Sequence, residues 1–186
     1  MIYNSFMDLT ETKLSSNELY RGKSFAFTLD TVKLPDGNTV QKEVLHHPGG
    51  VAMLAVKDGS VLIERQFRYA VGEELIEIPA GKLDKIPGET PEAAAHRELR
   101  EETGYIARDL IYLGKIYPSP GVMSEGLYMY FVDSLEKGEE RELDEDEFLE
   151  VGWMPLETLK RAISDGTITD AKLLSALTMA EARGLI

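Results

Sequence analysis

The sequence predicts a domain of the α+β class, because stretches with strand-like patterns come first and a sharply bounded helix follows them. Further strand-like stretches come after this helix, and two segments with helical spacing close the chain. This order of elements favours helices layered against a sheet over a helix bundle.

The N-terminal part has the pattern of a β-hairpin. Residues 24–31 alternate between apolar and polar side chains, and residues 39–45 have the pattern of the returning strand. Between them, Pro35, Asp36 and Gly37 stand in the order that favours a turn. We therefore expect this hairpin to belong to a small antiparallel sheet.

Five later segments are expected to be strands, because they are short, apolar or alternating, and bounded in several cases by turn residues. These segments are residues 51–56, 61–66, 74–78, 110–117 and 126–132. Residues 136–150 are strongly acidic, and residues 156–164 and 170–183 are predicted to be helices.

Residues 91–103 carry clear helix signals at both ends. Thr90 suits the N-cap, Pro91 suits the first turn, and Glu92 is favourable near the positive end of the helix dipole. Three alanines follow, and Gly104 is a natural residue to end the helix. We expect the helix to span Pro91–Thr103.

Composition excludes several classes of function. The chain has 186 residues, of which 43% are apolar, and this suits one domain with a sizeable core. Its formal net charge is −13, and no cluster of Lys and Arg is present for nucleic acid or an anionic membrane. The absence of cysteine excludes disulfides, thiolate zinc sites and cysteine nucleophiles, and fits a cytoplasmic protein. We find no signal peptide and no apolar run of about 20 residues, the length of a membrane span.

Three glutamates gather on one flank of the predicted helix. At about 100° per residue, Glu102 lies about 40° from Glu98 on one side and Glu101 lies about 60° away on the other. Like charges at this spacing destabilise a helix unless a hard divalent cation, which prefers carboxylate oxygens, neutralises them. Arg97 precedes Glu101 by four residues and can hold it in place. The same spacing occurs on solvated acidic helix faces, but the glycines that flank the helix favour a metal site.

This segment resembles the Nudix box, in which Gly, five residues, Glu and seven residues precede Arg-Glu-aliphatic-x-Glu-Glu-x-Gly-aliphatic. The matching residues have the spacing of that motif: Glu89, Arg97, Glu98, Leu99, Glu101, Glu102 and Gly104. Two departures exist. Seven residues separate Gly81 from Glu89, so that Ile86-Pro87 resembles an insertion, and Tyr105 replaces the final aliphatic residue.

Outside the box, the chain resembles the ADP-ribose pyrophosphatases of the Nudix superfamily over nearly its whole length. Residues 75–82 resemble their approach to the box, and Pro120, 16 residues past Gly104, resembles the proline that marks this group. The resemblance implies a Nudix α/β/α sandwich with a small N-terminal antiparallel β-sheet extension. Residues 1–48 would form a β-rich region for dimerisation and substrate contact, and residues 49–186 the catalytic domain.

The resemblance also implies a Mg²⁺ site, with Mn²⁺ as an alternative ion. Its ligands would be the Ala80 carbonyl and the carboxylates of Glu98, Glu101, Glu102 and Glu147. The implied catalytic residues are Glu145, which would activate water, together with Glu101 and Arg97. Residues 143–147 resemble a loop that closes over the substrate, and the alternative is a merely solvated acidic loop.

The implied reaction is hydrolysis of the pyrophosphate bond of ADP-ribose to AMP and ribose 5-phosphate. Substrate contacts would come from Arg68, Lys82, Glu125, Lys42 and Glu43, and the alternative for Arg68 is a surface ion pair. A GDP-mannose or other nucleotide-sugar pyrophosphatase would share this chemistry. A non-catalytic nucleotide-sensing module on the same fold is an alternative of a different class. The resemblance further implies a homodimer with exchanged N-terminal regions, and no nucleic-acid or membrane partner.

Overall fold

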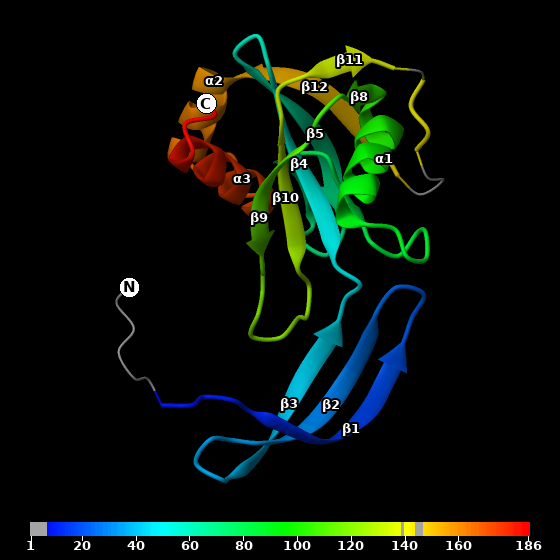
Figure 1. Ribbon diagram of the computed structural model, residues 1–186, viewed down its shortest axis with the longest axis vertical. Coiled ribbons are helices and arrows are strands. Elements are labelled where there is room, and N and C mark those ends of the chain that lie inside the picture. Colours follow the sequence, from blue (N-terminus) through cyan, green and yellow to red (C-terminus); the bar gives the residue numbers. More distant parts are fainter. Residues whose placement is uncertain (1–6, 139, 144–146) are drawn as a thin grey trace. The chain divides into compact units, whose positions relative to one another are not determined.

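The structure is a computed structural model that describes residues 7–138, 140–143 and 147–186. The chain folds into two compact units (Figure 1). The first contains the residues up to Pro48 together with Ser119–Glu125. The second contains Gly49–Pro118 and Gly126–Ile186. The first unit therefore includes a short segment that begins some 70 positions after Pro48 in the sequence.

The first unit is built on an antiparallel sheet with the strand order β1-β2-β3. Its strands are β1 (Thr12–Arg21), β2 (Ala26–Lys33) and β3 (Thr39–His46). In the turn between β2 and β3, the Asp36 carboxylate accepts a hydrogen bond from the Asn38 amide at 2.9 Å. Gly37 adopts φ +88°, a conformation that favours glycine. The predicted hairpin and the small antiparallel sheet are confirmed.

Strand β1 was not predicted from the sequence. Every residue in it is exposed, so its apolar residues do not alternate with polar ones as they do in a half-buried strand. Backbone pairing with β2 defines it, from Thr12 opposite Lys33 to Arg21 opposite Ala26.

The second unit contains a mixed sheet with the order β12-β5-β4-β10-β9, in which β6 pairs with β5 and β7 with β4. Strands β4 and β10 are parallel, and the other pairs are antiparallel. The strands are β4 (Gly50–Lys57), β5 (Ser60–Arg68), β6 (Glu73–Glu77), β7 (Ala80–Lys82), β9 (Ile111–Ile116), β10 (Leu127–Val132) and β12 (Leu149–Pro155). A separate pair consists of β8 (Tyr105–Ala107) and β11 (Leu135–Lys137).

Helices cover both faces of this mixed sheet (Figure 1). On one face, Val51 and Met53 of β4 share a core with Leu99 of α1 (Pro91–Thr103). On the other face, Leu54 belongs to a core that includes residues of α2 (Leu156–Ser164) and α3 (Ala171–Ala182). Strand β4 is therefore buried on both sides, which explains its continuous apolar run. The expected α/β/α sandwich is confirmed.

Helix α1 has the bounds and the caps that the sequence predicts. The Thr90 hydroxyl accepts a hydrogen bond from the Ala93 amide at 3.2 Å. At the other end, Gly104 has φ 72° and its amide donates to the Arg100 carbonyl at 2.8 Å. The caps satisfy backbone N–H and C=O groups that have no partner within the helix, so they fix where the helix begins and ends. The positions of the glutamates within the helix follow from these bounds.

Besides β1, four strands were absent from the sequence prediction. Three of them, β7, β8 and β11, are only three residues long, too short to show an alternating pattern. The fourth, β12, begins inside the acidic stretch and pairs with β5 from Leu149 opposite Gln66 to Pro155 opposite Ser60. None of the helices in the described parts of the chain is long and apolar enough to cross a membrane.

Candidate active site

Two glutamates of α1 are buried against the strand β7. Glu98 and Glu102 are only 7% and 5% exposed. The amide of Ala80 donates a hydrogen bond to Oε2 of Glu102 at 3.0 Å. A Cβ at position 81 would lie 2.0 Å from Cδ of Glu98, so this approach of the carboxylate to the strand requires Gly81. The helix thus presents two carboxylates to the backbone at 80–81.

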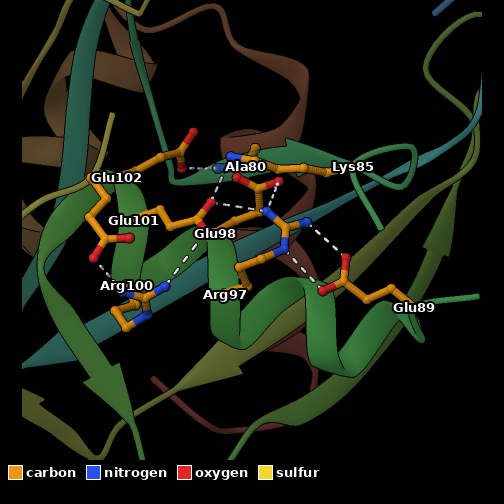
Figure 2. A network of polar contacts seen from close by, with 9 residues as sticks. Ala80, Lys85, Glu89, Arg97, Glu98, Arg100, Glu101 and Glu102 are labelled. Atoms are coloured by element: carbon orange, nitrogen blue, oxygen red, sulfur yellow. Dashed lines mark hydrogen bonds and ion pairs between the residues drawn. The ribbon is translucent and has the colours of Figure 1, made fainter. Parts of the chain in front are cut away.

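Arg97 connects three glutamates around this site (Figure 2). Its guanidinium binds the Glu89 carboxylate through two hydrogen bonds, of 3.0 and 2.8 Å. The same group lies 2.8 Å from Oε1 of Glu98 and donates to Oε2 of Glu101 at 3.1 Å. The expected contact between Arg97 and Glu101 is confirmed. The bidentate partner is Glu89, and this hydrogen bond lowers the pKa of its carboxyl.

The loop before α1 contains the two residues that resemble an insertion. Its tip is a turn in which the Glu89 amide donates to the carbonyl of Ile86 at 3.1 Å. Ile86 is 48% exposed, and Glu89 still reaches Arg97. Lys85 in this loop binds Oε2 of Glu101 at 2.9 Å (Figure 2). The longer loop therefore leaves Glu89 in contact with the helix and adds a cation beside Glu101.

A third buried carboxylate, Glu64 of β5, was missed by the sequence analysis. It is 4% exposed, and its Oε1 accepts no hydrogen bond from the described residues. Burial and the charge of Glu77 raise its pKa to about 8. Burial likewise raises the pKa of Glu98, which the contact with Arg97 only partly offsets. Burial and the charges of Glu64, Glu98 and Glu147 raise the pKa of Glu102 well above its ordinary value.

Glu77 of β6, also missed, has a different environment. Arg68 donates two hydrogen bonds of 2.6 Å to its carboxylate, and Lys172 of α3 donates a third of 2.7 Å. Lys172 also binds Asp170, the N-cap of α3, at 2.7 Å. Burial would raise the pKa of Glu77, but the two cations hold it below its ordinary value. One signal in the sequence could have indicated this residue: Glu77 is the only polar residue at positions 75–78 of the predicted strand.

The comparisons with known proteins decide the family. The NUDIX domain family model matches residues 45–177. An ADP-ribose pyrophosphatase of Bacillus subtilis (strain 168) is 40% identical over 91% of each chain. This chain belongs to the Nudix family. A methanol dehydrogenase activator of Bacillus methanolicus is 34% identical over 90% of each chain. The crystal structure of an ADP compounds hydrolase shares the fold, with a TM-score of 0.80, 22% identity, and coverage of 98% of this chain and 100% of that one.

Buried carboxylates in and beside the Nudix box fit a hard divalent cation. Glu98 and Glu102 of the box and Glu64 of β5 are buried, and no donor among the described residues reaches one carboxylate oxygen of Glu64. Such a cluster is costly unless positive charge compensates it. Among the described residues, no three acidic or histidine side chains converge closely enough to enclose a metal ion by themselves. This agrees with Mg²⁺ chemistry, in which one or two carboxylates act together with water and substrate phosphates.

The acidic loop of this Nudix chain is only partly described. Glu145, predicted to activate water, lies outside the described residues. Glu147 is half-buried, and its charge acts on both Glu64 and Glu102. Nearer α1, the amide of Glu142 donates to the carbonyl of Glu101 at 2.9 Å. The loop therefore begins against α1, and Glu147 lies near the buried carboxylates.

The predicted substrate contacts fall in both units. In the second unit, Arg68 binds Glu77 and keeps 40% of its side chain exposed, and Lys82 is exposed at the end of β7. In the first unit, Lys42 binds Glu11 at 2.7 Å, and Glu43 is exposed. Glu125 lies 3.3 Å from Nε2 of His47, to which the sequence analysis assigned no role.

His47 forms part of a small polar and aromatic group in the first unit. Its ring stacks on Phe25, with 5.0 Å between ring centroids. His47 lines a surface cavity of about 530 Å³, and the lining also includes Arg21, Thr28 and His46. The contact between His47 and Glu125 joins residues 78 positions apart in sequence, which a local pattern cannot reveal.

Proposed function

We propose that this Nudix protein hydrolyses the pyrophosphate bond of ADP-ribose, giving AMP and ribose 5-phosphate, with Mg²⁺ as cofactor. The observation that carries the proposal is the excess of buried carboxylate between α1 and β7. Glu98 and Glu102 are more than nine-tenths buried, and burial raises the pKa of each. The name of the relative from Bacillus subtilis supports the choice of ADP-ribose.

Glu98 and Glu102 would hold the cation, with the Ala80 carbonyl, Glu101 and Glu147 completing the protein ligands. When bound, the cation supplies the positive charge that neutralises the diphosphate and favours attack by water. Glu145 would accept the proton of that water. Arg97 acts through its contacts, because it orients the Glu98 and Glu101 carboxylates while Glu89 fixes the guanidinium.

The remaining predicted residues would bind the substrate. Arg68 and Lys82 in the second unit would contact phosphate or ribose, and Arg68 is already oriented by Glu77. Lys42, Glu43 and Glu125 in the first unit would contact the nucleoside. Because both units carry such residues, we expect substrate specificity to depend on the N-terminal sheet as well as on the Nudix box.

The experiment is an assay of the purified protein with ADP-ribose and Mg²⁺, in which AMP and ribose 5-phosphate are quantified by chromatography. We expect both products in equal amounts, and no products when a chelator removes the metal. GDP-mannose and other nucleotide sugars serve as competing substrates, and we expect a lower kcat/KM for each. A nucleotide-sensing module would bind ADP-ribose without releasing AMP, and that result would overturn the proposal.

We further propose that the protein is a cytoplasmic homodimer that associates through its N-terminal sheet. Strand β1 supports this because it is an edge strand whose apolar side chains Leu14, Leu19 and Tyr20 are 55%, 52% and 66% exposed. Sedimentation analysis would test it. We expect the parent to sediment as a dimer and the variant Leu14→Glu, Leu19→Glu to shift toward the monomer. A monomeric parent would contradict the proposal.

A further inference from the structure

Glu64 is an unusual residue for the interior of a sheet. It is 4% exposed, and its Oε1 is the single buried side-chain nitrogen or oxygen in the described part of the chain that has no hydrogen-bond partner. An unpaired buried carboxylate is expensive to maintain, and in native proteins it calls for a partner such as an ion.

Strand geometry places the Glu64 carboxylate on the α1 side of the sheet. Side chains two residues apart in a strand lie on the same face, and Leu62 belongs to the core that contains Leu99 of α1. Glu64 follows Leu62 on that face, as Glu102 follows Leu99 by one helical turn. Among the charges that raise the pKa of Glu102, that of Glu64 is the largest, ahead of Glu98 and Glu147. The charge of Glu64 therefore acts on Glu102 from the same side of the sheet.

The cationic side chains near Glu64 form their hydrogen bonds with another carboxylate, that of Glu77. Glu77 stands directly opposite Glu64 in the β5–β6 pair. The hydrogen bonds of Arg68 and Lys172 in this region go to Glu77, at 2.6 and 2.7 Å. Their charges act on Glu64 only from a distance, and they donate nothing to its Oε1. The pair formed by Glu64 and Glu102 thus has a deficit of positive charge.

We infer that Glu64 of β5 is a further ligand of the divalent cation, which it shares with Glu102 of α1. This inference rests on the proposed metal-dependent function. Hard cations accept oxygen ligands from several elements of a fold, and an additional carboxylate strengthens their binding. The ion would supply the partner that Oε1 lacks and would also relieve the repulsion between the two glutamates.

A buried neutral carboxylic acid with no role in metal binding is the competing explanation. In that case glutamine, which has the same shape and no charge, would replace Glu64 without effect on the metal. The shared-ligand explanation predicts a loss of metal affinity, because an amide oxygen carries no charge to attract the cation. The two explanations are therefore separated by a binding measurement that needs neither substrate nor turnover.

The experiment measures binding of Mn²⁺ alone to the full-length protein by titration calorimetry. Glu64→Gln is compared with the parent and with Glu74→Gln, a matched change on β6 at a carboxylate that is 57% exposed and paired with Arg65. We expect Glu64→Gln to weaken Mn²⁺ affinity about tenfold or more, the range typical of groups that support a metal site. We expect Glu74→Gln to bind like the parent. Mn²⁺ should raise the Tm of Glu64→Gln less than it raises the Tm of the parent. For Glu74→Gln the rise in Tm should equal that of the parent.

The outcomes distinguish failure of the inference from failure of the proposed function. Parental Mn²⁺ affinity in a folded Glu64→Gln variant would overturn the inference and leave the proposed function intact. A parent that binds no divalent cation would overturn both. If Glu64→Gln proves unfolded by circular dichroism, Glu64→Val takes its place, because an apolar side chain suits a buried strand position. Parental affinity in Glu64→Val would then overturn the inference in the same way.

Discussion

Two groups of buried carboxylates lie in the second unit, and they differ in their counter-charges. Glu77 binds two cations, Arg68 and Lys172, through three hydrogen bonds. Glu64 has a carboxylate oxygen without any hydrogen bond from the described residues, and its charge raises the pKa of the buried Glu102. Glu77 thus has cationic partners in direct contact, whereas no cation among the described residues donates to Oε1 of Glu64.

The pKa directions express this difference. Burial acts on both groups, but the cations hold the pKa of Glu77 below its ordinary value, whereas the pKa of Glu102 rises well above it. A compensated buried carboxylate stays ionised, and removal of one partner from such a pair is costly. An uncompensated one destabilises the metal-free protein, and such groups gather at functional sites. The comparison therefore supports a structural role for Glu77 and the proposed metal-binding role of Glu64 and Glu102.

The largest expected effect comes from removing the charges of the two buried glutamates of α1, Glu98 and Glu102. In Glu98→Gln, Glu102→Gln, we expect kcat/KM for ADP-ribose to fall on the order of a thousandfold, because metal charge contributes several kcal/mol to such reactions. We expect the Tm of the metal-free variant to be no lower than that of the metal-free parent, because two buried like charges are gone. Steady-state kinetics and thermal melts measure the two effects. Activity retained within tenfold, with Glu74→Gln as the matched control, would break the comparison.

The next effect is expected from Glu77, and it is a loss of stability and not a loss of activity. Glu77→Ala leaves the buried Lys172 and the half-buried Arg68 without their shared partner. Breaking a buried ion pair in this way costs about 3 kcal/mol or more of unfolding free energy. Urea denaturation with and without Mg²⁺ would measure it, and we expect the loss to be equal in both conditions. A loss that Mg²⁺ restores would assign Glu77 to the metal site and contradict its architectural role.

Much of the architecture and one part of the site could be predicted from the sequence, because their signals are local. Thr90, Pro91 and Gly104 stand within the segment whose ends they set, and Glu98, Glu101 and Glu102 repeat at helical spacing. The hairpin turn at Asp36 and Gly37 is equally local. Such features need no knowledge of which strands pair.

The rest of the site depends on pairing between distant segments. Glu77 and Lys172 are 95 positions apart, and only the strand order brings α3 to β6. Glu64 faces α1 because of the register of β5, and a shift by one residue would have turned it to the opposite face. Strand β1 escaped prediction because it is exposed throughout. Sequence patterns therefore predicted the helix that carries the proposed metal ligands but not the buried carboxylates of the sheet.

The next prediction concerns Arg97, which contacts three glutamates beside the proposed metal site. A lysine at position 97 keeps the charge but cannot bind Glu89 in a bidentate manner and also reach Glu98 and Glu101. We expect Arg97→Lys to lower kcat for ADP-ribose roughly tenfold to a hundredfold, about 1.4 to 3 kcal/mol, with little change in KM. The concentration of Mg²⁺ needed for half-maximal rate should rise. A rise in KM alone would show that Arg97 binds substrate and does not position the carboxylates.

The last prediction concerns the dependence of stability on pH in the metal-free protein. The folded protein keeps the proton of Glu64 up to a pKa of about 8, whereas an unfolded chain releases it near 4.5. Between these values the folded state binds more protons, so the free energy of unfolding falls as pH rises, by roughly 1 kcal/mol per pH unit for one group. The raised pKa of Glu102 acts in the same direction.

Glu77 contributes the opposite slope on the acid side. Its pKa is lowered in the folded protein, so its contribution to stability is present above about 4.5 and is lost as pH falls through the folded value. Urea denaturation of chelator-treated protein between about pH 5 and pH 8 measures the alkaline branch. We expect the slope of the parent to be reduced in Glu64→Gln and to diminish in the parent when Mg²⁺ is added, because a bound cation displaces the proton. A flat or rising stability of the metal-free parent over this range would contradict the charge deficit on which the comparison depends.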